Sequence, residues 1–225
     1  MSKLRILLLW CTAIIIFCLC LVAANWQYDR HVVRDLKSSE MDRAYALPVA
    51  NLKENLLNES IFQPVRISGR FTDESSLIRK RPYDGRNGFW VVAQFQADFG
   101  GRFAVLQGWI PADRSATSVV TNPAKASKRI IIEGNLREFE SQSDASDLPL
   151  GQEANLSKNV VDNDQKYFIH LTTMDTWILE SQIWTVPLPR LGNGPHLFYA
   201  YQWVIFGLIA LIGAAYLNYD ERIKR

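Results

Sequence analysis

Cysteine is scarce in this chain of 225 residues, and its three cysteines, Cys11, Cys18 and Cys20, all lie in one apolar run near the N-terminus. The remainder of the chain therefore cannot form a disulfide and must take its stability from an apolar core. Cys18 and Cys20 lie two positions apart, about 200° around a helix axis, so they cannot bind one metal ion together. We interpret all three as small hydrophobic residues within a membrane-spanning helix.

Catalytic signatures are also missing. The sequence contains no Gly-x-Ser-x-Gly, no Gly-x-x-x-x-Gly-Lys and no His-Glu-x-x-His, and its only histidines are His31, His170 and His196. These absences remove the common hydrolase, nucleotide-binding and metalloprotease patterns. We expect a protein that is not an enzyme, although catalytic carboxylates leave no reliable trace in one sequence.

An excess of positive charge is likewise absent. Lys and Arg number 25 against 23 Asp and Glu, which gives a formal net charge of +2. Proteins that bind nucleic acid through the phosphate backbone carry a dense basic face. We therefore expect no nucleic-acid partner.

Two long uncharged apolar runs stand at opposite ends of the chain, residues 6–24 and 197–217. A helix of 19 residues covers roughly 28 Å, close to the thickness of the hydrocarbon core of a bilayer. Basic residues flank the outer end of each run, at Lys3 and Arg5 and at Arg222, Lys224 and Arg225. By the positive-inside rule both termini stay in the cytoplasm, so the segment between the spans is exported.

The first run could instead be a cleaved signal peptide, because Val22-Ala23-Ala24 is an acceptable cleavage site. Its length exceeds the usual 7 to 15 apolar residues of a signal peptide, which favours a retained span. Too few residues precede it for a mitochondrial transit peptide. We expect a multi-pass protein of a bacterial inner membrane with a periplasmic domain and contact with membrane lipid, divided into residues 1–5, 6–24, 25–196, 197–217 and 218–225.

The central segment mixes helical and strand patterns. Helical spacing of apolar residues predicts that the first span continues as a helix to about Ala46, followed by a short helix over 49–57. Period-two alternation and turn residues predict strands, including a hairpin with its turn at Asp98–Gly101, over 65–71, 76–80, 88–95, 102–110, 129–139, 167–171 and 183–186. The fold class expected is an α+β membrane protein whose two spans flank an antiparallel β-sheet or small barrel with short helices.

Residues 140–164 differ in composition from the rest of the central segment. They include six acidic residues, one lysine and few large apolar side chains. Such a segment gains little from burial to offset the entropy of ordering. We predict a flexible acidic insertion.

The start of the second apolar run has a helix-start signal, Gly194-Pro195, which puts His196 in the first helical turn. The positive end of the helix dipole favours the neutral imidazole that a metal ion requires. His196 is therefore the candidate metal ligand of this sequence.

One face of the same helix carries mostly small residues, at spacings of three and four: His196, Ala200, Trp203, Gly207, Ala210 and Ala214. A small-residue face usually packs closely on another transmembrane helix. Alternatively, it leaves a slot below the imidazole for a flat apolar macrocycle. Both interpretations remain open from the sequence.

Two further histidines and one basic cluster have weaker signals. His31 lies beyond the first span on the same side as His196, either as a surface residue or close to that imidazole. His170 falls in a strand pattern and is expected in the core or at an edge. Residues 79–81 with Arg86 are either a solvated loop or a clamp for carboxylates or lipid headgroups.

Several short patterns in this order resemble the Surfeit locus protein 1 family of cytochrome c oxidase assembly factors. They are Trp26-Gln27-Tyr28-Asp29-Arg30, Gly69-Arg70-Phe71, Gly85-Arg86-Asn87-Gly88-Phe89, Gly108-Trp109-Ile110-Pro111, and His196 to Trp203 with Tyr199 and Ala200 between. The likeness covers nearly the whole chain outside 140–164. Gln107 departs from it, since the family usually has Arg there, and so does the Gly194-Pro195 pair before His196.

The resemblance implies a role in building the haem-copper oxidase, chiefly in delivering haem a to the catalytic subunit of cytochrome c oxidase. Haem a synthase is a second partner implied in this way. By matching position, His196 would contact the haem iron, supported by Trp26, Gln27 and Arg30. Tyr199, Trp203 and His31 are further candidate residues of the cofactor site. The alternative is a scaffold that stabilises an oxidase assembly intermediate without binding haem.

Overall fold

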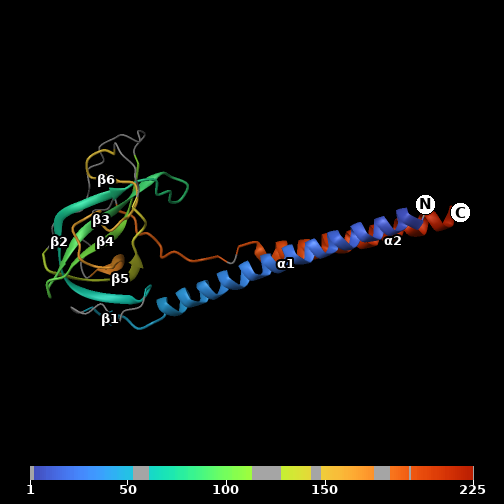
Figure 1. Cartoon of the computed structure of the whole chain (residues 1–225). Helices are drawn as coiled ribbons and strands as arrows, with labels where there is room; N and C mark the ends of the chain where they lie inside the picture. Colours follow the sequence, from blue (N-terminus) through green and yellow to red (C-terminus); the bar gives the residue numbers. More distant parts are fainter. Residues whose placement is uncertain are drawn as a thin grey trace. The chain divides into compact units, whose positions relative to one another are not determined.

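The structure is a computed structural model that describes residues 3–52, 61–112, 128–142, 148–174, 183–192 and 194–224. The chain divides into two compact units. A helical unit comprises Met1–Glu40 with Arg190–Arg225, and a sheet unit comprises Met41–Pro189 (Figure 1).

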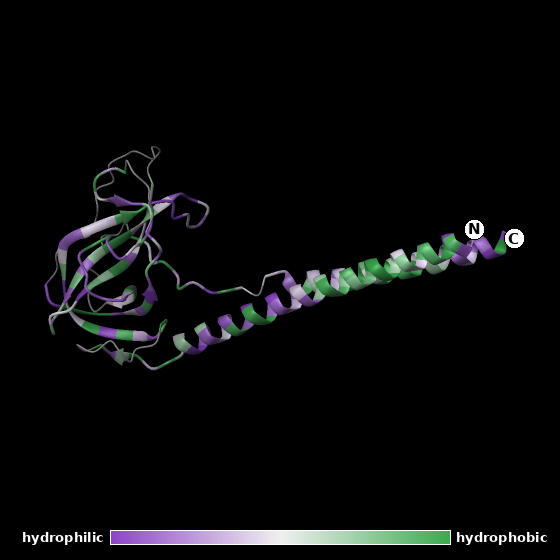
Figure 2. Ribbon diagram, viewed as in Figure 1, coloured by the Kyte–Doolittle hydropathy of each residue, from purple (hydrophilic) through white to green (hydrophobic). Residues whose placement is uncertain are grey.

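Two long helices dominate the helical unit, α1 over Lys3–Tyr45 and α2 over His196–Ile223. By length and composition both qualify to cross a membrane, and Figure 2 shows their long hydrophobic stretches in green. No Gly or Pro interrupts α1, which explains why it continues beyond the apolar run as predicted. Pro195 is the N-cap of α2 and His196 its first helical residue.

The two helices run side by side in opposite directions, so the N-terminal end of α1 and the C-terminal end of α2 lie together (Figure 1). The buried residues of α2 are Ala200, Gly207 and Ala214, seven positions apart. A Cβ atom on Gly207 would lie 2.8 Å from Cδ2 of Phe17 and 3.2 Å from Cβ of Cys20. The small-residue face therefore packs against α1, as in a left-handed helix pair.

This packing agrees with the first interpretation of that face, a close contact with another helix. Phe17 and Cys20 of α1 occupy the space beside Gly207 in which a macrocycle would have to lie. The predicted slot below His196 is thus filled by the protein's own first helix.

Five strands of the sheet unit close into a barrel: β2 (Pro64–Ile78), β3 (Gly88–Ala97), β4 (Arg102–Pro111), β7 (Tyr167–Met174) and β5 (Ile130–Glu138). They pair in that order, and β5 pairs with β2 to complete the ring. All pairs in the ring are antiparallel except β4 with β7. This connectivity is that of a five-stranded Greek-key barrel of the OB type, and it confirms the expected small barrel.

The length and shape of β2 allow the barrel to close. Its 15 residues pair first with β5 and then with β3, and Gly69 takes part in both pairings. A Cβ atom at Gly69 would lie 2.1 Å from the carbonyl oxygen of Gln96, so only glycine fits there. A register shift between Phe71 and Ser75 marks an irregularity that lets the strand curve.

Apolar residues pack on both faces of the barrel wall. In β4, Phe103 and Val105 belong to a cluster of buried residues that come from all five barrel strands. This cluster forms the interior of the barrel. Ala104 and Leu106 point the other way, into a second cluster with Leu156, Val160 and Val161. The wall is therefore covered on its outer face by the segment before β7.

That covering segment corrects the prediction for residues 140–164. Leu156 is fully buried, Val160 and Val161 are almost so, and Gln152–Glu153 forms β6, parallel to the end of β2. The composition argument failed because three well-placed aliphatic side chains are enough to attach the segment. The part of it that the structure describes, 140–142 and 148–164, is not a loose insertion.

Two further predictions need correction. Ala50–Asn51 forms β1, parallel to β2 at Val65 and Arg66, where a short helix was expected; residues 53–60 of that prediction lie outside the described residues. The expected strand at 183–186 is reduced to a single bridge between Trp184 and Trp109. In both places only one or two residues pair with a neighbouring strand, so neither segment forms a helix or a long strand.

Candidate functional site

The clearest polar contact of the helical unit joins His196, the first residue of α2, to Gln27 of α1. Nδ1 of His196 lies 3.0 Å from Oε1 of Gln27. Gln27 lies beyond the uncharged run of α1, and His196 lies just before that of α2. The site thus stands at one end of both apolar runs.

This contact determines which nitrogen of His196 carries the proton. A carbonyl oxygen can only accept a hydrogen bond, so Nδ1 must be the donor. In the neutral imidazole Nε2 then keeps its lone pair. Hydrogen bonding through one ring nitrogen is the usual way in which proteins orient a metal-ligating histidine.

The other edge of the imidazole lies beside Gly194. A Cβ atom at this glycine would lie 3.3 Å from Cδ2 and 3.5 Å from Nε2 of His196. The φ angle of Gly194 is +64°, which glycine adopts readily and residues with a side chain rarely do. Glycine here therefore keeps the side of the Nε2 atom free of a side chain.

The connection that leads to His196 is tied to α1 by two hydrogen bonds. Nε of Arg34 donates to the carbonyl oxygen of Gly192 over 2.5 Å, and Oγ of Ser38 donates to that of Leu191 over 2.9 Å. Together with the Gln27 contact they align the start of α2 with residues 27–38 of α1. The sequence patterns did not point to Ser38 or to this role of Arg34, because long-range bonds to backbone carbonyls leave no mark in spacing.

His31 lies one helical turn after Gln27 and is half-buried. Its Nδ1 atom is buried and has no hydrogen-bond partner among the residues that the structure describes, and its ring lies 6.5 Å from that of Tyr28. No direct interaction joins it to His196 in the described residues. The structure leaves its predicted role in the site as a prediction.

The remaining predicted site residues are aromatic or cationic and face outward. Trp26, Tyr199 and Trp203 expose 54%, 45% and 38% of their surface. The guanidinium of Arg30 lies over the Trp26 ring, 5.3 Å from its centroid. Exposed amphipathic rings of this kind suit the headgroup level of a bilayer.

The metal chemistry open to this site is restricted. Within the described ranges, no group of three or more His, Cys, Asp or Glu side chains could hold a metal ion. A single imidazole fits a metal whose other ligands are supplied by the ligand molecule, as they are in haem. A bare ion would need further protein ligands. The donor set at His196 therefore fits a metalloporphyrin better than a free ion.

The basic cluster of the sheet unit is largely engaged within the protein. Arg81 pairs with Glu140, and its guanidinium lies 4.2 Å from the centroid of the Trp90 ring. Arg86 lies over Trp184 at 5.6 Å. Arg81 at least is a structural residue that joins the loop after β2 to the segment after β5, so neither a freely solvated loop nor a carboxylate clamp describes it.

His170 is a core residue, in agreement with the sequence. Its Nε2 atom donates to the carbonyl oxygen of Val186 over 2.8 Å, and its Nδ1 atom accepts from Arg137 at 3.4 Å. The pKa of His170 is lowered to about 4, chiefly by burial, with a smaller lowering by the positive charge of Arg137; the hydrogen bond to Val186 opposes both. This histidine is neutral near pH 7 and holds the segment that leads toward α2.

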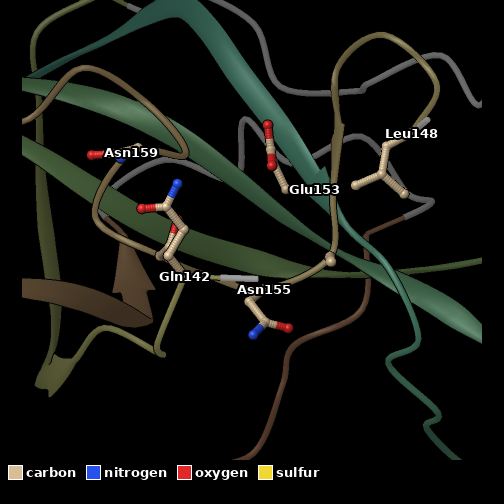
Figure 3. Close-up of a pocket in the computed structure, with 7 residues that line it drawn as sticks. Gln142, Leu148, Glu153, Asn155 and Asn159 are labelled. Atoms are coloured by element: carbon tan, nitrogen blue, oxygen red, sulfur yellow. The ribbon is translucent and has the colours of Figure 1, made fainter. Parts of the chain in front are cut away.

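A small pocket lies beside β6 (Figure 3). It is lined by Gln142, Leu148, Glu153, Ala154, Asn155, Ser157 and Asn159. Among its described lining residues, Glu153 has the only ionisable side chain, and none is a histidine. This lining provides no acid and base pair and no metal-binding set.

Comparisons of the sequence with known proteins show the family to which the chain belongs. A sequence model described as the SURF1 family matches residues 14–208. The chain belongs to the SURF1 family. SURF1-like proteins of Mycobacterium bovis and Mycobacterium tuberculosis, named as uncharacterized, are 25% identical to it over 212 residues, which cover 89% of this chain and 78% of theirs. The residues matched by the family model, 14–208, include Gln27, His196 and the strands of the barrel.

Proposed function

We propose that this SURF1 family protein is a membrane-anchored assembly factor for haem-copper cytochrome c oxidase, which binds haem a and helps to insert it into the catalytic subunit. The observation that carries the proposal is the 3.0 Å contact between Gln27 and His196. It leaves Nε2 of His196 available, beside a glycine, at the level where α2 enters its apolar run.

Haem a is the cargo in this proposal, and Nε2 of His196 would bind its iron. Gln27 holds the imidazole in the tautomer that ligation needs. The exposed rings of Trp26, Tyr199 and Trp203 provide apolar surface at the membrane level, where a hydrophobic macrocycle would arrive from the lipid. Because α1 fills the face below His196, we place the macrocycle beside the helix pair and not between the helices.

We also propose the orientation in the membrane. The antiparallel helix pair supports a topology with both termini on one side, and the flanking basic residues favour the cytoplasm for that side. The barrel is then periplasmic, in a bacterial inner membrane. There it can meet the oxidase subunit and haem a synthase without any catalytic activity of its own.

The experiment compares full-length protein purified in detergent from cells that make haem a. Wild type should show a Soret absorbance band, and His196→Ala should lose most of it. Phe198→Ala, a neighbour with 78% exposure, is the matched control and should keep the band. An unchanged band in His196→Ala would overturn the role of His196 as the haem ligand, and no band in wild type would overturn haem binding.

A second measurement separates delivery of haem from scaffolding. A strain carrying His196→Ala should assemble an oxidase that lacks haem a. If the variant supports full oxidase assembly, the protein is a scaffold that acts without cofactor, and the haem-delivery proposal is wrong.

A further inference from the structure

We infer that Arg34 binds a carboxylate of the same ligand whose metal is bound by His196, so that the site selects an anionic metalloporphyrin over a bare metal ion. This inference rests on the proposed function and adds the ligand's polar anchor. Neither the motifs nor the family match assigns any role to Arg34.

The imidazole of His196 and the guanidinium of Arg34 both lie close to Gly194. The position that a Cβ atom of Gly194 would take is 3.5 Å from Nε2 of His196 and 3.7 Å from Nε of Arg34. Nε2 of His196 and the guanidinium of Arg34 thus both lie close to Gly194, which has no side chain to occupy the space beside them.

One hydrogen bond holds the guanidinium of Arg34 in place and leaves other donor groups for a ligand. Its Nε atom donates to the carbonyl oxygen of Gly192. Among the described residues no partner engages its two terminal amino groups, which can donate two parallel hydrogen bonds to one carboxylate. Since Arg34 is otherwise exposed, a ligand can reach these groups.

The charge of Arg34 is not neutralised by its helix neighbours. Side chains three and four positions away are the ones that reach it, and these positions hold Arg30, His31, Lys37 and Ser38. No carboxylate pairs with Arg34 anywhere in the described chain. The local potential is therefore positive, which attracts anions.

This potential gives the site its selectivity. A guanidinium beside Nε2 repels a divalent cation that has no charge-balancing ligand, which disfavours binding of free Zn²⁺ or Cu²⁺. A porphyrin with carboxylate arms satisfies both groups, since its metal meets the imidazole and one carboxylate meets the arginine. Haem carries such carboxylates on flexible arms at the edge of its ring.

The test uses full-length protein in detergent, titrated with ferric protoporphyrin IX and with its dimethyl ester, in which both carboxylates are masked. The inference predicts that wild type binds the free acid at least tenfold more tightly than the ester. Arg34→Gln should weaken binding of the acid by about tenfold and leave the ester unchanged. Lys37→Gln, which removes a neighbouring positive charge, is the matched control and should have a much smaller effect.

The outcomes separate this inference from the proposed function. The role of Arg34 would be overturned if wild type bound acid and ester equally well, or if Arg34→Gln bound the acid as tightly as wild type does. Haem binding by His196 would still be supported in that case if His196→Ala lost binding. If wild type bound neither porphyrin, this inference would be wrong, whereas the proposed function would still be decided by the Soret band of protein from cells that make haem a. Binding of Zn²⁺ alone as tight as that of the acid porphyrin would refute the proposed selectivity.

Discussion

Oε1 of Gln27 and Nδ1 of His196 lie 3.0 Å apart and link the two apolar helices at one end. The pair comes from positions 169 residues apart in the sequence. It gives Gln27 a chemical role, which is to fix the proton of the imidazole on Nδ1. A residue that acts through another in this way is a positioning residue, and its removal should affect affinity more than fold.

Replacing Gln27 tests this role directly. Gln27→Leu removes the acceptor, so the imidazole can rotate or change tautomer, and haem affinity should fall by about tenfold. Gln27→Glu keeps an acceptor oxygen and should bind haem nearly as wild type does. The measurement is a Soret titration of each full-length variant, and equal affinities for Gln27→Leu and wild type would contradict the role.

Much of the framework was predictable from local patterns. The apolar runs, the long first helix and the hairpin over 88–110 depend on residues close in sequence, and all appear in the structure. Barrel closure depends on Gly69, which pairs with two strands at once, and single-sequence periodicity cannot reveal a double pairing. Residues 148–164 were misjudged because composition averages over a segment, whereas packing depends on a few side chains, here Leu156, Val160 and Val161, being in the right place.

The site was predictable in part for a similar reason. His196 stands out by its helix-start signal, and Gln27 was identified only through resemblance. Arg34 and Gly194 have roles that depend on where the backbone of residues 191–194 runs along α1. No spacing rule encodes that path.

The attachment of residues 148–164 can be measured through Leu156. Its side chain is fully buried against the outer wall of the barrel, so Leu156→Ala should lower the free energy of unfolding by about 2–5 kcal/mol. Leu150→Ala is the matched control, because Leu150 is fully exposed and its truncation should change stability by less than about 0.5 kcal/mol. Denaturant unfolding followed by tryptophan fluorescence gives both values. Equal effects of the two substitutions would show that the segment is not attached as described.

The buried His170 predicts a pH dependence of stability. Its pKa is about 4 in the folded protein and about 6.5 when unfolded, so the unfolded chain binds more protons between these values. Stability from the neutral histidine is complete above pH 6.5 and is lost as the pH falls toward 4, by up to about 3 kcal/mol.

His170→Gln is the variant that isolates this effect. Its amide can still donate to Val186 and accept from Arg137, but it does not titrate. The melting temperature of wild type should therefore fall more between pH 7.5 and pH 5 than that of the variant. Parallel pH profiles for the two proteins would exclude His170 as the source.

The close approach of the two helices predicts that Gly207 tolerates no side chain. Gly207→Leu would collide with Phe17 and Cys20 and force α2 away from α1. Cys20 is buried between the helices, so it should become several-fold more reactive toward N-ethylmaleimide in a background where the exposed Cys11 and Cys18 are replaced by serine. Gly213→Leu is the control, because a Cβ atom there meets no neighbour within 4 Å and its side chain would face lipid. If Cys20 stayed equally protected in both variants, the helices would not be packed through Gly207, and the alignment of His196 with Gln27 would need another cause.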